Sequence, residues 1–211
     1  MATMFMMSHH AFRRGLTRFA RALAEDPPPR PAALADEWKG FHAALHGHHA
    51  MEDGNILPGL AKEHPRVAPV VAALAEDHRR IDPLLARGDA AFARLAERGA
   101  ARESAAVVAE LQALLDPHLA KEEAEIVPFL RKVLRFEAPP LDDAMAALYA
   151  EGFAWSSHGV APDVLDRVYP MLPEVLRNRL PAARAAFAAH CERVWGTAVA
   201  GASRTPVPDW L

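Results

Sequence analysis

Apolar side chains recur at steps of three and four residues along four long stretches of the chain, which is the spacing of one face of an α-helix. The stretches cover about residues 3–25, 31–57, 65–97 and 103–135. Prolines follow the first and the last of them, at 27–29 and 139–140, where they prevent a helix from continuing. Four amphipathic helices with short connections predict an all-α protein built on an antiparallel, up-down-up-down four-helix bundle.

Glycine and proline residues also predict irregular turns within three of these helices. Gly54 and Pro58 mark a place where the second helix distorts or ends. Pro83 in the third helix should kink or split it, because proline removes one backbone hydrogen bond and crowds the preceding turn. Pro117 predicts a similar irregularity in the fourth helix.

Polar residues interrupt the four apolar lines at six positions where the pattern calls for a core residue. They are His9, His48, Glu52, His78, His118 and Glu122. Burying imidazoles and carboxylates costs several kcal/mol unless each group is paired or bound to a metal. A single core histidine is more often a structural residue, but here each of four helices contributes one, and two carry a glutamate one turn later on the same face. The set therefore predicts a metal site in the bundle core.

The donor atoms of this set are nitrogen and oxygen, which suits iron, manganese or zinc. Two bridging carboxylates, the four histidines and one oxo or hydroxo bridge would supply about ten of the about twelve bonds that two six-coordinate ions need. About two positions would stay open to water, dioxygen, peroxide or another small ligand.

Three segments of the sequence resemble the hemerythrin-like (HHE, cation-binding) family. They are His48–Pro58 (HHAMEDGNILP), His118–Pro128 (HLAKEEAEIVP) and Ser8–Arg14 (SHHAFRR). The resemblance covers about residues 5–135 and implies a four-helix bundle with a non-heme di-iron centre, the six residues above being its ligands. Oxygen-carrying members have a second histidine where this chain has Leu74, and an aspartate as the second bridge where it has a glutamate. These departures favour a reactive or sensing site over storage of intact dioxygen.

Two functions follow as expectations. The first is a non-heme di-iron protein that binds or reacts with dioxygen, hydrogen peroxide or nitric oxide, either as an oxidoreductase or as a sensor or carrier. The second is a metal-responsive regulatory or interaction module, in which iron or zinc stabilises the bundle and the region from Trp155 to Trp195 presents a partner surface.

Other residues have alternative interpretations. A second stripe of the second helix, beside the apolar line, also has the spacing of metal ligands. We favour a solvated face, or a shell of residues that orients the ligands, over a separate metal site. The stripe comprises His42, His46, His49 and Asp53. Asp82 could form a third pair with His78, although Pro83 disturbs that geometry. For a few further residues ordinary packing is favoured over a role near the centre: Tyr149, Tyr169 and Cys191.

Residues beyond the fourth helix predict a second part of the protein. A bundle over residues 1–136 and a helical extension over 137–211 are expected, the extension packing on the bundle or forming a homo-oligomer interface. His158 and His190 would reach the site if the extension caps the bundle, and residues 201–211 are expected to form a loose terminus.

The net charge of −3, with both signs interspersed, gives no reason to expect nucleic acid or a membrane as partner. A single cysteine and the lack of a leader pattern favour a cytoplasmic protein.

Overall fold

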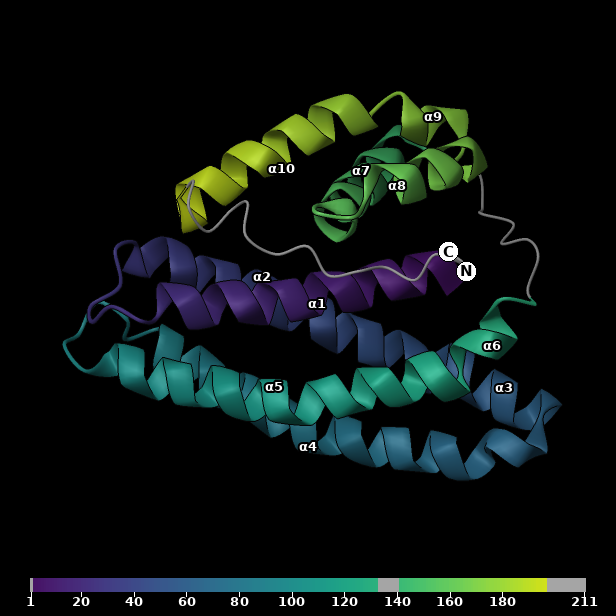
Figure 1. Cartoon of the computed structure of the whole chain (residues 1–211), viewed down its shortest axis with the longest axis horizontal. Coiled ribbons are helices and arrows are strands. Elements are labelled where there is room, and N and C mark those ends of the chain that lie inside the picture. The colour runs from purple at the N-terminus through teal and green to yellow at the C-terminus, as the bar shows by residue number, and fades with distance from the viewer. Residues whose placement is uncertain (1, 133–140, 197–211) are drawn as a thin grey trace. The chain divides into compact units, whose positions relative to one another are not determined.

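A computed structural model describes residues 2–132 and 141–196, whose regular secondary structure is all helical, with no strand among them (Figure 1). The elements are α1 (Ala2–Ala22), α2 (Pro31–Met51), η1 (Glu52–Ile56), α3 (Leu57–Glu63), η2 (Pro65–Val67), α4 (Ala68–Phe92), α5 (Ala100–Glu125), α6 (Val127–Leu130), α7 (Asp143–Ser157), α8 (Pro162–Val168), η3 (Tyr169–Met171), α9 (Glu174–Arg177) and α10 (Leu180–Trp195). The expected all-α class is confirmed.

The described residues form two compact units. One contains residues 15–132, and the other joins residues 2–14 to residues 141–196. The expected boundary between positions 136 and 137 and the loose terminus at 201–211 lie outside the described residues. The extension helices therefore share a unit with the beginning of the chain.

Aromatic packing around Trp38 forms one end of the core of the unit 15–132. The indole of Trp38 stacks on Phe92 with ring centroids 4.4 Å apart, and Phe19 packs edge-on against both rings. The indole N–H donates to Asp89 at 2.9 Å, so the polar edge of the buried ring is satisfied. These aromatic residues lie on the apolar lines of three predicted helices, and their contacts tie α2 to α4 and to the later part of α1.

The helices of this unit are less interrupted than the prolines predict. The helix α4 runs without a break through Pro83, and α5 does so through Pro117, so of the two predicted effects of Pro83 the split is wrong and the kink stays a prediction. The irregular turn lies on α2 instead, where residues 52–56 form a π-helix and Leu57 N–H donates to the carbonyl of Glu52. The predicted distortion near Gly54 is thus confirmed, but the chain stays helical to Glu63.

The unit of residues 2–14 and 141–196 has its own apolar core. Met7 of α1 packs with Phe153 of α7 and with Val164 of α8. The buried Arg14 donates hydrogen bonds to the carbonyl oxygens of Trp155 and His158. The sequence places Arg14 and His10 on a more polar face of the first helix, yet both are buried, because the extension helices of this unit cover that face.

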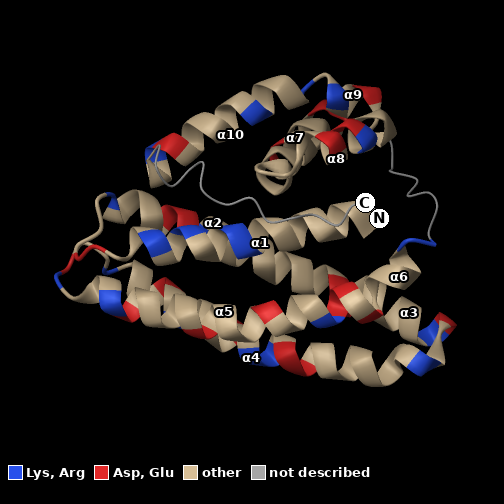
Figure 2. Cartoon of the chain, in the orientation of Figure 1, with Lys and Arg blue, Asp and Glu red and all other residues tan. Residues whose placement is uncertain are grey.

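Basic and acidic residues are interspersed along the helices of the unit 15–132 (Figure 2). None of the described helices combines the length and the apolar character needed to cross a membrane.

A pair of glycine substitutions tests the packing around Trp38. A Cβ atom at Gly88 would lie 1.9 Å from Cζ2 of Trp38, and the same indole is stacked on Phe92. We expect Gly88→Ala to lower the free energy of unfolding by about 2 kcal/mol. Gly40→Ala meets no atom within 4 Å on exposed α2 surface and should raise it by about 0.5–1 kcal/mol. Urea unfolding measures both, and equal stability of the two variants would contradict this packing.

Candidate metal centre

Five of the six predicted ligands lie together inside the unit 15–132. The five are His48, Glu52, His78, His118 and Glu122, and all are buried. The helices α2, α4 and α5 and the π-helix η1 contribute them, because each lies on the apolar line of its own helix. The sixth, His9, is buried in α1 among residues 2–14 of the other unit, 4.5 Å from the ring of Phe5. Its participation in the site stays a prediction.

One group of donor atoms gathers around His78 and His118. Their Nε2 atoms lie 3.3 Å apart, and Oε2 of Glu52 lies 3.5 Å from Nε2 of His78. Four ligand atoms lie within 4.8 Å of one another, one each from His49, Glu52, His78 and His118. Three imidazoles and a carboxylate oxygen at this separation can surround a single cation.

A second group of donor atoms shares Glu52 with the first. Oε1 of Glu52 lies 3.1 Å from Nε2 of His48, and ligand atoms of His48, Glu52 and Glu122 fall within 4.8 Å of one another. Oε1 of Glu122 lies 3.5 Å from Nε2 of His118, so Glu122 also stands between the two groups. The two oxygens of Glu52 thus face two different sets of nitrogen donors.

His49 is the main departure from the sequence interpretation. The stripe assignment places it on a solvated face or in an orienting shell, but it is buried and belongs to the first donor group. Its ring stacks on that of His78, with centroids 4.1 Å apart, and neither of its ring nitrogens has a hydrogen-bond partner. Burial, followed by the neighbouring imidazoles His78 and His48, lowers the pKa of His49 to about 2. A neutral imidazole with buried nitrogens is the form that binds a metal.

Two outer carboxylates contact the far nitrogens of the paired histidines. Nδ1–H of His78 donates to Oδ2 of Asp53 at 3.0 Å, which agrees with an orienting role for Asp53. Oδ2 of Asp77 lies 3.7 Å from Nδ1 of His118 and accepts a hydrogen bond from Lys121 at 2.9 Å. Burial alone would raise the pKa of Asp77, but Lys121 and His118 together lower it, so the carboxylate stays ionised. Such contacts fix the ring orientation and basicity of a metal-binding histidine.

Asp77 is a further candidate residue of this site that the sequence pattern does not single out. Its signal was weak, since it precedes His78 directly and lies off the apolar line of its helix. Only the pairing of α4 with α5 shows that it faces His118 and Lys121.

Burial of the two glutamates shows that the cluster fits a cation. Glu52 and Glu122 are fully buried. Burial first, and then the negative charge of Glu52, raise the pKa of Glu122 well above its usual range. Two adjacent carboxylates in a dry interior need a proton or a cation to offset their repulsion. With imidazole nitrogens on both sides, a divalent or trivalent cation satisfies the whole donor set at once.

The remaining candidates lie elsewhere. Oδ1 of Asp82 lies 3.6 Å from Nδ1 of the exposed His46, and the proposed pair of Asp82 with His78 stays a prediction. Four further residues belong to the other unit, and none is part of a donor group found among the described residues: Tyr149, Tyr169, His158 and His190. Cys191 is a buried residue on α10, as expected for a packing residue.

Acidification of the metal-free protein tests the environment of His49. Because the pKa of His49 is about 2 in the folded state and 6.5 without the fold, protons bind preferentially to the unfolded chain below pH 6.5. Stability should therefore fall as pH falls, by about 1.4 kcal/mol from this residue between about pH 7.5 and 5.5. Urea unfolding of chelator-treated His49→Gln should lack this contribution, while His46→Gln on the exposed face should keep it. An unchanged pH dependence in His49→Gln would contradict the buried position.

Comparison with known proteins agrees with this geometry. The family model described as Hemerythrin HHE cation binding domain matches residues 1–130. No curated protein and no solved structure shows significant similarity to the chain. The match covers more than half of the chain and includes every residue of the two donor groups. The chain therefore belongs to the hemerythrin HHE cation-binding domain family.

Proposed function

We propose that the buried cluster holds two iron ions and that the protein binds or reacts with a small oxidant: dioxygen, hydrogen peroxide or nitric oxide. The observation that carries this proposal is the position of Glu52, whose two oxygens face two separate groups of imidazole nitrogens. A carboxylate in that position bridges two ions, whereas a single-ion site would use it from one side only. The nitrogen and oxygen donors suit iron, and manganese or zinc could replace it.

In this proposal each ion takes its ligands from one donor group. His49, His78 and His118 would bind the first ion, and His48 the second. Glu52 and Glu122 would bridge the two, with an oxo or hydroxo bridge between them. His9 is added as a further ligand of the second ion from its register on the first helix and from the family resemblance. The expected up-down-up-down order of four helices is part of the same proposal.

The position of His49 changes the expected number of open coordination positions. Leu74, one turn before His78 on α4, is fully buried and offers no donor. The ion bound by His78 would therefore lack the nitrogen ligand that oxygen-carrying members of the family have at this position. His49 lies against the ring of His78 and could supply that nitrogen from α2. The donors would then fill about eleven of about twelve positions, leaving about one for an external ligand. Such a site favours binding or reduction of a single small oxidant.

The protein residues would provide orientation and exclusion of water. Bound iron would supply the redox chemistry toward the oxidant. The contacts of Asp53 with His78 and of Asp77 with His118 would hold the two rings in place. Because the donor residues are buried, only a small molecule could reach the centre. Oxidant reduction and oxidant sensing both agree with this arrangement.

A specific surface favours the second candidate function, a metal-responsive interaction module. Met145, Leu148 and Tyr149 lie at helical spacing on α7 and are exposed, Leu148 by 61%. An exposed apolar stripe of this kind is typical of a contact surface for another protein or a second copy of the chain.

Metal analysis of one substitution tests the site. The purified protein should contain about two irons per chain and show charge-transfer absorption of a bridged ferric pair. His118→Ala should lose most of the metal and the absorption, because it removes a donor from the centre of the first group. The matched His46→Ala, which is 61% exposed on the same bundle unit, should keep both. Full metal content in His118→Ala would overturn the ligand assignment.

Exposure to oxidants separates the two candidate functions. The reduced, iron-loaded protein should change its absorption spectrum on addition of dioxygen, hydrogen peroxide or nitric oxide. His49→Ala should alter that spectrum more than His42→Ala, which removes a partly exposed imidazole that contacts Asp89. Strong stabilisation by iron or zinc together with no spectral response to any of the three oxidants would favour the interaction module instead.

A further inference from the structure

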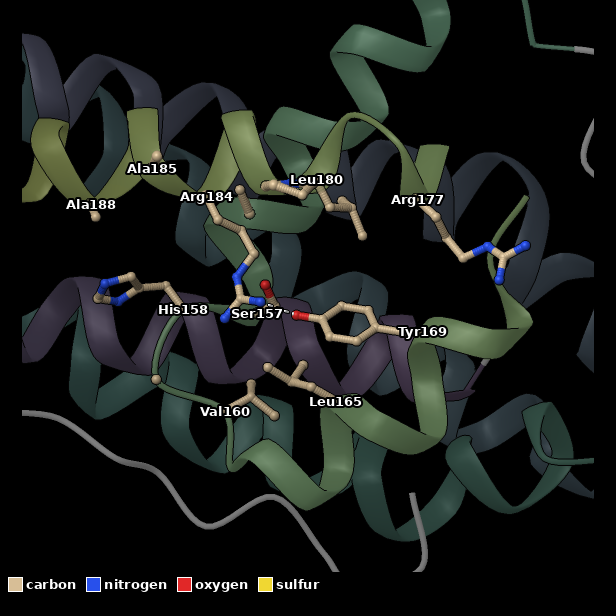
Figure 3. Close-up of a pocket in the computed structure, with 13 residues that line it drawn as sticks. Ser157, His158, Val160, Leu165, Tyr169, Arg177, Leu180, Arg184, Ala185 and Ala188 are labelled. Carbon is tan, nitrogen blue, oxygen red and sulfur yellow. Dashed lines mark hydrogen bonds between the residues drawn. The ribbon is translucent and has the colours of Figure 1, made fainter. Parts of the chain in front are cut away.

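A cavity of about 780 Å³ lies within the unit of residues 2–14 and 141–196, separate from the metal cluster (Figure 3). It is lined by the end of α7, the turn that follows, α8, η3, α9 and α10. Its apolar walls include Ala154, Val160, Leu165 and Leu180. A volume of this size is typical of sites for small organic molecules.

Charge in the cavity has a single sign. The charged residues among those that line it are Arg177 and Arg184, and the lining contains no aspartate or glutamate. Both guanidinium groups are positively charged hydrogen-bond donors. The cavity is thus complementary to an anion that also carries apolar surface.

Three side chains of the cavity can donate hydrogen bonds to a ligand. Nη1 of Arg184 donates to the phenol oxygen of Tyr169, and the guanidinium lies 5.7 Å from the centre of that ring. Because the phenol oxygen accepts this bond, its own hydrogen remains available to a ligand. Oγ of Ser157 is buried and has no hydrogen-bond partner. In Figure 3 the three groups point toward the same part of the cavity.

A hydrogen-bonded backbone turn directly follows Ser157, one of the three donors. Gly159 ends α7 with a φ of 89°, a conformation that glycine adopts without strain, and Val160 N–H donates to the carbonyl of Ser157 at 3.0 Å. The carbonyl of His158 accepts hydrogen bonds from Arg14 and His10. The donors are therefore held in place before any ligand binds.

We propose that this cavity binds an organic carboxylate with an extended apolar chain. The carboxylate, which only accepts hydrogen bonds, receives them from Arg184, Tyr169 and Ser157. The apolar chain lies against the side chains of Val160, Leu165 and Leu180. Arg184 and Ala188 are exposed, so the ligand enters along α10. No residue of the site is a proposed metal ligand, and the proposal stands without the metal centre.

Titration of the full-length protein with decanoate, followed by calorimetry, tests the site. We expect saturable binding of a single decanoate per chain. Arg184→Gln should weaken it by about tenfold or more, because a charge-assisted hydrogen bond is lost. Tyr169→Phe should weaken it severalfold. The matched Arg193→Gln, an exposed arginine of the same helix that does not line the cavity, should leave the affinity unchanged.

Control ligands test separately the contribution of the carboxylate charge and that of the apolar chain. Decanol lacks the charge, and acetate and inorganic phosphate lack the apolar chain, so each should bind at least tenfold more weakly than decanoate. His118→Ala should bind decanoate as the unsubstituted protein does, which excludes the metal cluster as its site. The proposal is overturned if decanoate does not saturate, if decanol or phosphate matches it, or if Arg184→Gln and Arg193→Gln behave alike.

Discussion

Two glutamates, Glu52 and Glu122, are fully buried within one group of donor atoms, and their mutual repulsion is the constraint around which the rest of the bundle unit is arranged. A dry interior leaves such a pair only two ways to persist, by holding a proton or by binding a cation. The raised pKa of Glu122 shows the first of these, and the surrounding imidazole nitrogens provide for the second. The apolar lines of three helices bring Glu52, Glu122 and every surrounding imidazole except that of His49 together in the core. The packing of Trp38 on Phe92 joins two of these helices, α2 and α4, elsewhere in the core.

The π-helix at residues 52–56 explains how neighbouring positions of one helix all contribute to the cluster. A turn with one extra residue changes the phase of the side chains that follow, and such turns often occur at functional sites. Glu52 and Asp53 both reach His78, one at Nε2 within 3.5 Å and the other at Nδ1 within 3.0 Å. Adjacent residues of a regular α-helix point about 100° apart and would seldom contact the same ring. The irregular turn therefore shapes the first donor group and its outer carboxylate together.

The second unit uses the beginning of α1 for a different purpose. Arg14 and His10 are anchored to backbone carbonyls of the turn after α7, and Met7 packs into the core of α7 and α8. This anchoring also holds the turn after α7, which lines the cavity next to Ser157. A single helix thus carries a predicted metal ligand, His9, and the polar residues that order a separate candidate site.

Much of this protein could be predicted from its sequence alone. Helical spacing of apolar residues determined the all-α class, and the same spacing selected His48, Glu52, His78, His118 and Glu122, because a buried polar residue on an apolar line is a local anomaly. The role of His49 could not be predicted, since it lies one residue off that line and only the closeness of α4 brings His78 against its ring. Asp77 and the donor set of the cavity depend in the same way on contacts between helices far apart in the sequence. Periodicity determines which face of a helix is buried, and tertiary packing alone decides which side chains of other helices that face meets.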